Sequence, residues 1–215
     1  KQALMKLNRE FAFCVTVQAS PFYGNYWKKY CNSWRSNTDS IDTWENIKER
    51  FYTVDVWDKY VVPGHFYDLD MLETGTLHTN GGKSGITEDE AVFAYTLRAF
   101  FMSPIQLSCD LSKLTDFEYN LYCNDEIIAI HQDSLAKYPQ LIFENGECKI
   151  YKRQLENGDE AWAIFNAGDT ETSDTLDFGK TVKIRDVWTK EDLSEGNSLN
   201  YNIGPHCVRV LRISA

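Results

Sequence analysis

The 215-residue sequence lacks the apolar runs and the basic charge that membranes and nucleic acids require. No apolar stretch reaches the roughly 18 residues needed to span a bilayer, and no signal-peptide pattern opens the chain. Acidic residues outnumber basic ones, 32 against 22, which gives a net charge of −10. Because nucleic-acid backbones and anionic lipid surfaces attract basic proteins, we expect neither as a partner. Since Lys1 is not a natural start, we expect this chain to be part of a longer protein.

The sequence also lacks the patterns of a metal site or of a disulfide framework. None of the six cysteines forms a C-x-x-C pair and the four histidines share no ligand spacing, so neither a metal nor another cofactor is expected. Most of the cysteines fall in apolar runs, where buried reduced thiols are expected, with one or two disulfides as the alternative. The cysteines are Cys14, Cys31, Cys109, Cys123, Cys148 and Cys207, and the histidines are His65, His78, His131 and His206.

Aromatic residues, in contrast, are abundant. Hydrophobic residues make up 43% of the chain and aromatic residues 14%, a composition that excludes an intrinsically disordered protein. The aromatic rings suit either a packed core or a surface that stacks on sugar rings. Trp27 and Trp34 are candidates for such stacking, whereas the helical spacing of Trp44 and Trp57 favours the core.

The first 137 residues alternate short apolar runs with helical patterns. Residues 43–57 carry apolar side chains at helical spacing, and Thr87 opens a helix with Glu90 as the second half of a capping box. That helix is expected to stop before Pro104. Strands are expected at residues 10–18, 31–34, 60–67 and 105–108, and further helices near residues 2–7, 111–123 and 125–130. Strands that alternate with helices are typical of a parallel α/β fold.

The pattern changes after residue 140, where seven short alternating runs follow one another. The turn signals N-G-E, N-G-D, A-G-D and E-G-N separate them. They cover residues 141–143, 148–153, 161–166, 175–178, 182–186, 199–203 and 207–213. Short strands at this spacing predict an antiparallel β-sandwich, with residues 133–139 as the linker before it. The sequence thus predicts an α/β domain over residues 1–137 and an all-β domain over residues 138–215.

Arg35 and Asp39 lie just after a predicted strand and before the next predicted helix. In a (β/α) barrel, the loops that follow the strands line the active face. A guanidinium group can bind sugar hydroxyls, and a neighbouring carboxyl group can protonate a leaving oxygen. Capping of the helix that begins near Thr43 is the alternative role for Asp39, and for Asp42 it is the favoured role.

Three further aspartates follow predicted strands. Asp68 and Asp70 come at the end of the strand at residues 60–67, where one could bind substrate hydroxyls while the other braces the loop. A hydrogen-bonded turn is the alternative interpretation. Asp110 follows the strand at residues 105–108, where a helix N-cap is favoured. Acidic residues at the ends of parallel strands suit glycoside chemistry with two carboxyl groups, without proving it.

Five segments, in order along the chain, resemble a known family. Cys31–Trp44 (C-N-S-W-R-S-N-T-D-S-I-D-T-W) resembles the acid/base segment of glycoside hydrolase family 27, the α-galactosidase and α-N-acetylgalactosaminidase family. The segment D-L-D-M-L-E-T-G, which starts at Asp68, resembles that family's D-P-D-M-L-x-x-G. The other segments are residues 87–111 (similar to T-x-x-E…A-L-W-A-x-x-x-S-P-L-x-x-x-x-D-L), residues 124–135 (similar to N-x-E-V-I-A-I-N-Q-D-P-L), and residues 184–193 with 203–213 (similar to strands of its C-terminal sandwich).

The resemblance runs from about residue 10 to residue 213 and implies a role for each matching residue. Asp39 matches the family's general acid/base, Arg35 its sugar-binding arginine, and Asp70 a substrate-binding aspartate with Met71 packed nearby. The implied fold is the C-terminal half of a (β/α)8 TIM barrel, strands five to eight, followed by an antiparallel β-sandwich. The implied function is a retaining glycoside hydrolase that removes terminal α-linked galactose-type sugars.

Two departures from the family pattern bear on these roles. The family loop after the first of these strands, often C-E-W-P, is replaced by Cys14–Tyr23, which leaves galactose and N-acetylgalactosamine both open. Cys14, Gln18, Ser20 and Tyr23 are candidates for lining the sugar there. The family's nucleophile segment, Y-x-K-x-D at the end of the fourth barrel strand, has no counterpart here. We therefore expect the nucleophile and the N-terminal half of the barrel to lie outside this chain, and the chain alone to be inactive.

Two alternatives to this hydrolase stay open. A non-catalytic carbohydrate-binding or structural remnant would keep the sandwich and lose the chemistry, although the joint presence of Arg35, Asp39 and Asp70 argues against it. A relative that acts on β-arabinopyranosides or α-glucans is the second alternative. The expected partner is a carbohydrate substrate, and assembly into a homo-oligomer stays open. No N-x-S/T sequon occurs, which favours a bacterial-type enzyme and leaves secreted, periplasmic and cytoplasmic locations open.

Overall fold

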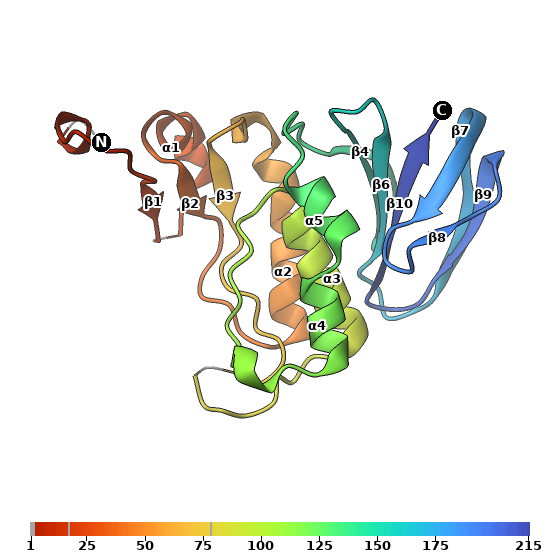
Figure 1. Ribbon diagram of the computed structural model, residues 1–215, viewed down its shortest axis with the longest axis horizontal. Helices are drawn as coiled ribbons and strands as arrows, with labels where there is room; N and C mark the ends of the chain where they lie inside the picture. The colour runs from red at the N-terminus through yellow and green to blue at the C-terminus, as the bar shows by residue number, and fades with distance from the viewer. Residues whose placement is uncertain (1–2, 17, 78) are drawn as a thin grey trace.

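The computed structural model of the chain describes residues 3–16, 18–77 and 79–215. Figure 1 shows three short strands at one end, the helices α2 to α5 in the middle, and a group of longer strands at the other end. The predicted order, helices and parallel strands first and antiparallel strands second, is confirmed in this coarse form. We call residues 3–138 the N-terminal part and residues 139–215 the C-terminal part.

The short strands of the N-terminal part form a parallel sheet in the order β1-β2-β3. Their bounds are β1 Cys14–Val15, β2 Ser33–Arg35 and β3 Phe66–Asp68. All three were predicted, but they are shorter than expected, and Val17 falls outside the described residues. The register places Arg35 opposite Asp68, so both strands end at the same edge of the sheet.

The prediction of a fourth strand at residues 105–108 is wrong. Leu107 makes only an isolated parallel bridge with Leu72. Two hydrogen bonds support this bridge, one from Leu72 N to Gln106 O (2.7 Å) and one from Ser108 N to Leu72 O (3.2 Å). Because Leu72 lies in a loop, the segment has no neighbouring strand along which a ladder could extend.

The capping box predicted at Thr87 opens a helix as expected. Glu90 N donates to Thr87 Oγ1 (3.2 Å) and Thr87 N donates to Glu90 Oε2 (2.8 Å), which confirms the capping box. A second box joins Thr115 to Glu118. The α-helices are α1 Gly24–Tyr30, α2 Trp44–Thr53, α3 Glu88–Phe100, α4 Asp116–Tyr122 and α5 Asp125–His131, and the 3₁₀ helices are η1 Leu4–Lys6, η2 Pro21–Tyr23, η3 Val54–Val56, η4 Asp58–Tyr60 and η5 Leu111–Lys113.

Three helical predictions need correction. Of the helix predicted at residues 2–7, the described residues 3–7 contain one 3₁₀ turn, and Gln2 lies outside the described part of the chain. The helix expected over residues 43–57 is α-helical only to Thr53, where two 3₁₀ turns follow. Helix α1 was not predicted, because its first residue, Gly24, is a poor helix former. Packing fixes this glycine in place, since a β-carbon there would come within 2.3 Å of the Tyr60 ring.

The C-terminal part is antiparallel, with the strand order β4-β5-β6-β10-β7-β8. The two strands predicted at residues 175–178 and 182–186 form one long strand, β7. Its first half pairs with β9 and its second half with β10, and Gly179, at φ +68°, lies where the register shifts. The strand bounds are β4 Gln140–Asn145, β5 Cys148–Gln154, β6 Glu160–Asn166, β7 Thr172–Asp186, β8 Glu191–Asp192, β9 Gly196–Ile203 and β10 Cys207–Ser214.

A cluster of aromatic rings joins the two parts. Phe165 on β6 is fully buried, and its ring centroid lies 5.2 Å from that of Phe51 on α2 and 5.0 Å from that of Phe93 on α3. Tyr151 on β5 packs edge-on against Phe101 at 4.8 Å. Such pairs are favourable beyond the apolar area that they bury, so the C-terminal part is held firmly against α2 and α3.

The predicted linker at residues 133–139 is also packed against the N-terminal part. Tyr138 donates a hydrogen bond to Val54 O (2.7 Å), and its hydroxyl lies 3.1 Å from the hydroxyl of Tyr67 on β3. Burial raises the pKa of both tyrosine hydroxyls well above their ordinary value. The connection between the two parts is therefore an ordered segment and not a flexible tether.

The six cysteines are free thiols, but only Cys31 and Cys148 are buried. Cys14 and Cys123 are exposed, because one lies on the edge strand β1 and the other follows the end of α4, so the expectation of mostly buried thiols is wrong. No group of three or more potential metal ligands occurs within the described ranges, from which His78 is missing. None of the helices in those ranges is long and apolar enough to cross a membrane.

Candidate active site

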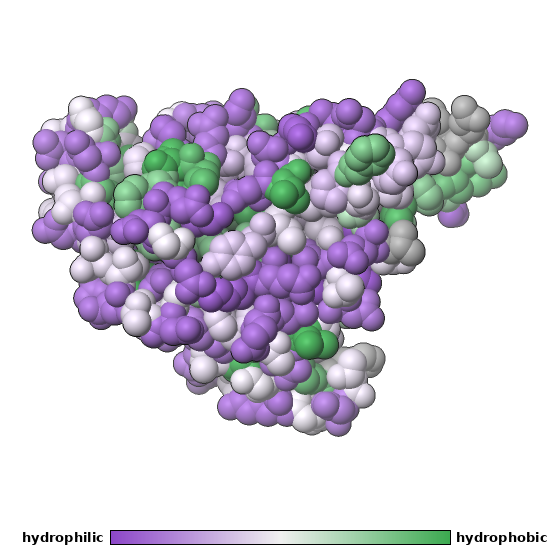
Figure 2. Space-filling model, turned by 180° about the vertical axis from the view of Figure 1, so that it is seen from behind, coloured by the Kyte–Doolittle hydropathy of each residue, from purple (hydrophilic) through white to green (hydrophobic). Residues whose placement is uncertain are grey.

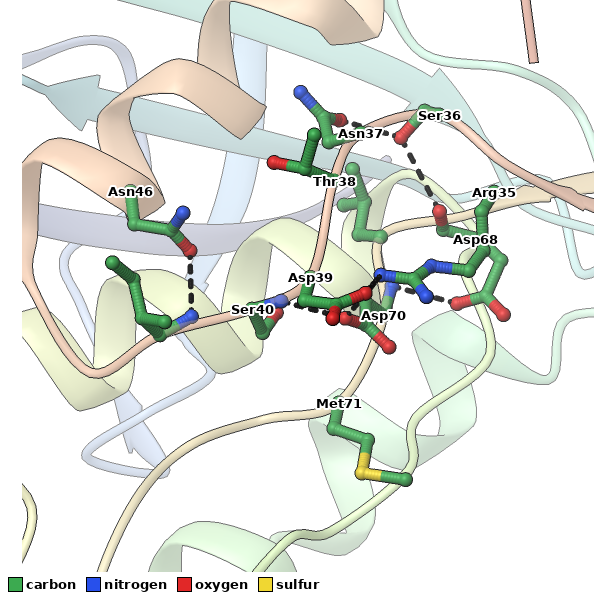
Figure 3. Close-up of polar contacts among 12 residues, drawn as sticks. Arg35, Ser36, Asn37, Thr38, Asp39, Ser40, Asn46, Asp68, Asp70 and Met71 are labelled. Carbon is green, nitrogen blue, oxygen red and sulfur yellow. Dashed lines mark hydrogen bonds and ion pairs between the residues drawn. The ribbon is translucent and has the colours of Figure 1, made fainter. Parts of the chain in front are cut away.

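Arg35, the last residue of β2, lies at the centre of a cluster of charged side chains. Its Nη2 donates to Asp39 Oδ1 (2.9 Å) and to Asp70 Oδ2 (2.6 Å). Figure 3 shows both carboxylates converging on the guanidinium group from two different loops. Because β2 and β3 are parallel neighbours, the loops that follow them meet at one edge of the sheet.

The loop after β3 turns sharply at Asp70, whose φ is +67°. A non-glycine residue in this region is uncommon and needs support from its surroundings. Asp68 Oδ1 accepts a hydrogen bond from Asp70 N (2.7 Å), and Asp70 Oδ2 also accepts one from Ser40 N (2.6 Å). The two interpretations of this loop, a hydrogen-bonded turn and a polar site, are thus compatible.

The capping roles considered for the aspartates are settled by the hydrogen bonds of α2. Thr43 is the N-cap of this helix and accepts from Asn46 N, so neither Asp39 nor Asp42 caps it. Asp42 Oδ2 instead accepts from Gly85 N at 2.7 Å. Threonine takes the cap because it directly precedes the first helical residue. The N-cap role predicted for Asp110 is confirmed, since its side chain accepts from Ser112 N at the start of η5.

An open cavity of about 440 Å³ lies over Arg35 and Asp39. The Asp39 side chain is 90% exposed, whereas the Arg35 side chain is only 13% exposed. Gln18, Thr16, Asn37 and Thr38 complete the lining. A carboxylate that is open to solvent, beside an anchored guanidinium group, can exchange hydrogen bonds with a polyhydroxylated ligand.

The other residues predicted for this site lie outside that lining. Met71 is 43% exposed, and its side chain points away from the two carboxylates in Figure 3. Cys14 is exposed on β1, and Ser20 and Tyr23 are exposed in and before η2. The structure therefore brings Gln18 to Arg35 and Asp39, but not the other three residues of the loop.

Of the two tryptophans proposed for sugar stacking, Trp34 lies in the core instead. Trp34 and Trp57 are buried, with ring centroids 5.8 Å apart. Trp44 stacks on the ring of His206 at 3.9 Å. Trp27 donates its Nε1 hydrogen to Ser20 O. The prediction of a core position is thus confirmed for Trp57, while the half-buried Trp44 packs at the edge of the core.

Two buried arginines belong to the site and were missed in the sequence. Arg50 on α2 donates to Thr38 O and Leu69 O, and Arg98 on α3 donates to the carbonyls of Leu69, Asp70 and Met71. The one signal in the sequence is a basic residue within an otherwise apolar helical run, A-V-F-A-Y-T-L-R-A-F-F. Their bonding partners lie far away along the chain, so local patterns could not reveal their role.

Asp68 offers a test of the electrostatics at this site. Burial raises the pKa of its carboxyl group above the ordinary value of 3.8. Because the pKa is higher in the folded state than in the unfolded state, protonation of this carboxyl stabilises the folded state. This stabilisation is fully present below about pH 3.8 and is lost as the pH rises through the folded-state pKa. Asparagine stays neutral and can still accept the hydrogen bond from Asp70 N.

We therefore expect the free energy of unfolding of Asp68→Asn to be higher than that of the wild type at neutral pH. This difference should shrink as the pH falls toward 4. Urea denaturation at several pH values in this range measures the difference. A constant difference across the range would contradict the assignment of the pKa shift to burial.

Two family profiles match the sequence of this chain, and several solved structures match its fold. The family profile described as "Alpha galactosidase A" matches residues 8–133, and that described as "Alpha galactosidase C-terminal beta sandwich domain" matches residues 145–213. Alpha-galactosidase 2 of Arabidopsis thaliana is 27% identical over 99% of this chain and 54% of its own length. Alpha-galactosidase A of Cellvibrio japonicus is 26% identical over 100% of this chain and 58% of its own length.

Solved structures agree with the fold. The GH27 β-L-arabinopyranosidase from Geobacillus stearothermophilus superimposes with a TM-score of 0.93 at 24% identity, covering 100% of this chain and 52% of that one. Alpha-galactosidase I from Mortierella vinacea superimposes with a TM-score of 0.89 at 22% identity, covering 99% of this chain and 60% of that one. The chain spans about half the length of the relatives that it matches. The two profiles together cover most of the chain, and the chain therefore belongs to the α-galactosidase family, glycoside hydrolase family 27.

Proposed function

We propose that the complete protein is a retaining glycoside hydrolase that removes terminal α-linked galactose-type sugars. The observation that carries this proposal is the placement of Arg35 between Asp39 and Asp70 at the ends of two parallel strands, in a chain of this family. In this proposal Asp39 is the general acid/base, while Arg35 and Asp70 bind sugar hydroxyls. Gln18 contributes to the sugar site from the wall of the cavity, whereas Met71 and Cys14 lie outside the cavity lining and have no part in this proposal.

The proposed reaction needs a second carboxylate. Retaining hydrolysis uses two carboxyl groups about 5–5.5 Å apart, one as nucleophile and one as acid/base. Asp39 protonates the departing glycosidic oxygen while the nucleophile attacks the anomeric carbon. Asp39 then takes a proton from water, which releases the sugar from the covalent intermediate. We place the nucleophile in a segment of the protein beyond this chain.

The shape of the N-terminal part supports this placement. Among the residues that the structure describes, β1 pairs only with β2, which leaves its outer edge open. Figure 2 shows apolar side chains on the surface at the end of the molecule where the N-terminal residues lie, and Leu7 and Phe22 are 53% and 86% exposed. Open strand edges and clustered apolar side chains favour a covering partner. We propose that β1–β3 belong to the second half of a (β/α)8 barrel over residues 1–137, and that residues 138–215 form the β-sandwich domain.

Hydrolysis by the complete protein is the direct test. We expect it to cleave p-nitrophenyl α-galactopyranoside and to release α-galactose first, as judged by NMR of the initial product. The 215-residue chain alone is expected to be inactive, because it lacks the nucleophile. Inversion at the anomeric carbon would contradict the retaining mechanism, and no cleavage of any p-nitrophenyl glycoside would support a non-catalytic remnant.

A β-L-arabinopyranosidase is the second candidate function. The solved structure with a TM-score of 0.93 is a β-L-arabinopyranosidase, and β-L-arabinopyranose has the ring configuration of α-galactose without its hydroxymethyl group. The same assay separates the candidates when it includes the α-galactoside, the α-N-acetylgalactosaminide, the β-L-arabinopyranoside and an α-glucoside. The ratio of kcat/KM values across this panel assigns the substrate.

A further inference from the structure

Arg98 reaches the loop after β3 from the buried side of α3. Its Nε donates to Asp70 O (3.0 Å), and its Nη2 donates to Met71 O (2.7 Å) and Leu69 O (3.2 Å). The same Nη2 lies 3.4 Å from Ser40 Oγ in the loop after β2. One guanidinium group therefore binds three consecutive carbonyls around the residue whose φ is positive.

Arg50 reaches the same region from α2. Its Nε donates to Leu69 O (3.0 Å) and its Nη2 donates to Thr38 O (2.7 Å). Thr38 directly precedes Asp39. Arg50 thus connects the two loops that carry the candidate acid/base and the candidate sugar ligand, and it shares the carbonyl of Leu69 with Arg98.

Within the described residues, neither of these buried cations forms an ion pair with a carboxylate, although Asp70 attracts both from a longer distance. Arg50 is 1% and Arg98 3% exposed, and their hydrogen bonds go to backbone carbonyls and to neutral side chains. Burial lowers the pKa of both guanidinium groups, that of Arg98 to about 9, and the charge of Arg50 adds to the shift at Arg98. A buried charge without an ionic partner is costly, and a core that needed only volume would be better filled by an apolar residue.

The space around these groups is nearly full. The cavity between the two loops and the two helices has a volume of about 10 Å³ and is lined by residues that include Arg50, Arg98 and Met71. A water molecule needs roughly 10–15 Å³. With both guanidinium groups in place at most one water can therefore enter, so the carbonyls of these loops are satisfied by the arginines and not by solvent.

From these contacts we propose that Arg50 and Arg98 are positioning residues for the reaction: Arg98 fixes Asp70 in its turn, and Arg50 fixes the segment that carries Asp39. This inference rests on the proposed hydrolase function. Neither arginine contacts the cavity over Arg35, so both act only through the loops. Lysine retains the charge but cannot donate to several separately placed carbonyls in the plane of one fork.

The test compares three lysine variants in the complete protein with p-nitrophenyl α-galactopyranoside as substrate. Arg98→Lys is expected to raise KM about tenfold with a smaller change in kcat, because it displaces Asp70. Arg50→Lys is expected to lower kcat about tenfold with a smaller change in KM, because Thr38 precedes Asp39. Arg153→Lys is the matched control. Arg153 is also 1% exposed and donates to a carbonyl, Phe100 O (3.1 Å), but it contacts neither loop.

A purely structural role would give a different result. It would lower the melting temperature of all three variants and reduce kcat equally through loss of folded protein, with KM unchanged. Equal kcat/KM values in Arg98→Lys, Arg50→Lys and Arg153→Lys, corrected for the folded fraction, would overturn the inference.

Hydrogen exchange provides a second measurement that does not depend on activity. Ser40 N donates to Asp70 Oδ2, so displacement of Asp70 should expose this amide. We expect faster exchange at Ser40 in Arg98→Lys than in Arg153→Lys. Unchanged exchange at Ser40 would overturn the inference, whether or not the complete protein is active. Failure of the complete protein to hydrolyse a galactoside would refute the proposed function instead.

Discussion

Asp39→Asn is expected to lower kcat/KM of the complete protein about 10²- to 10⁴-fold for a galactoside with a poor leaving group, because the amide cannot donate the proton that the glycosidic oxygen needs. The loss should be much smaller for a substrate with an acidic leaving group, such as a dinitrophenyl galactoside, which departs without protonation. Steady-state rates with both substrates measure the difference. The contrast between them separates a lost acid from a damaged fold.

Asp42→Asn is the matched control for this experiment. Asp42 lies three residues further along the same loop, and its carboxyl oxygen accepts a hydrogen bond from Gly85 N that an asparagine oxygen can also accept. We expect this variant to keep its activity toward both substrates. An equal loss in Asp39→Asn for good and poor leaving groups, or a loss in Asp42→Asn as large as in Asp39→Asn, would remove Asp39 from the acid/base role.

The second large effect concerns stability. Phe165→Ala is expected to lower the free energy of unfolding by about 3–5 kcal/mol, because truncation of a fully buried phenylalanine leaves a cavity that its neighbours fill only partly. Phe165 is 0% exposed and packs against rings from α2, α3 and β5. Urea denaturation followed by both tryptophan fluorescence and circular dichroism measures the loss.

Phe178→Ala is the control for this truncation. Phe178 is half-buried within the C-terminal part, where its ring centroid lies 5.2 Å from that of Trp162 in an edge-on arrangement, and it packs against a hydrophobic cluster formed by residues of that part. Its truncation should cost less and leave the two optical transitions coincident. Should Phe165→Ala prove no more destabilising than Phe178→Ala, the aromatic cluster would not be the main contact between the two parts.

Much of the secondary structure could be predicted from the sequence, because helix caps, proline positions and alternating runs are local patterns. The capping box at Thr87 and Glu90 and the stop before Pro104 each involve residues within a turn of the helix end, and both are confirmed. The alternating runs of the C-terminal part were likewise found as strands. The strand predicted at residues 105–108 failed because strand formation depends on a neighbour, and the neighbouring Leu72 lies in a loop.

The site was predicted less evenly. Arg35 and Asp70 were proposed from motifs and do meet through a hydrogen bond, but their function stays a proposal. The roles of Arg50 and Arg98 were not predicted. Their main partners are backbone carbonyls, which every residue has, so no sequence pattern indicates these contacts. The N-cap of α2 was assigned to Asp42 and belongs to Thr43, since the helix begins one residue later than that assignment requires.

Tyr138 has a consequence for how this protein could be recombined with its relatives. Its hydroxyl donates to the backbone of η3 and lies beside the hydroxyl of Tyr67, so the chain enters the C-terminal part from a fixed point. Tyr151 on β5 then donates to Asp55 Oδ1 in η3 (2.9 Å), so the junction is built from side chains of both parts. Residues 139–215 therefore cannot be exchanged for the corresponding residues of a relative without changes in the N-terminal part. A chimera that takes its strands from another member of the family has to take the complementary surface of α2, α3 and β3 with them, or redesign it.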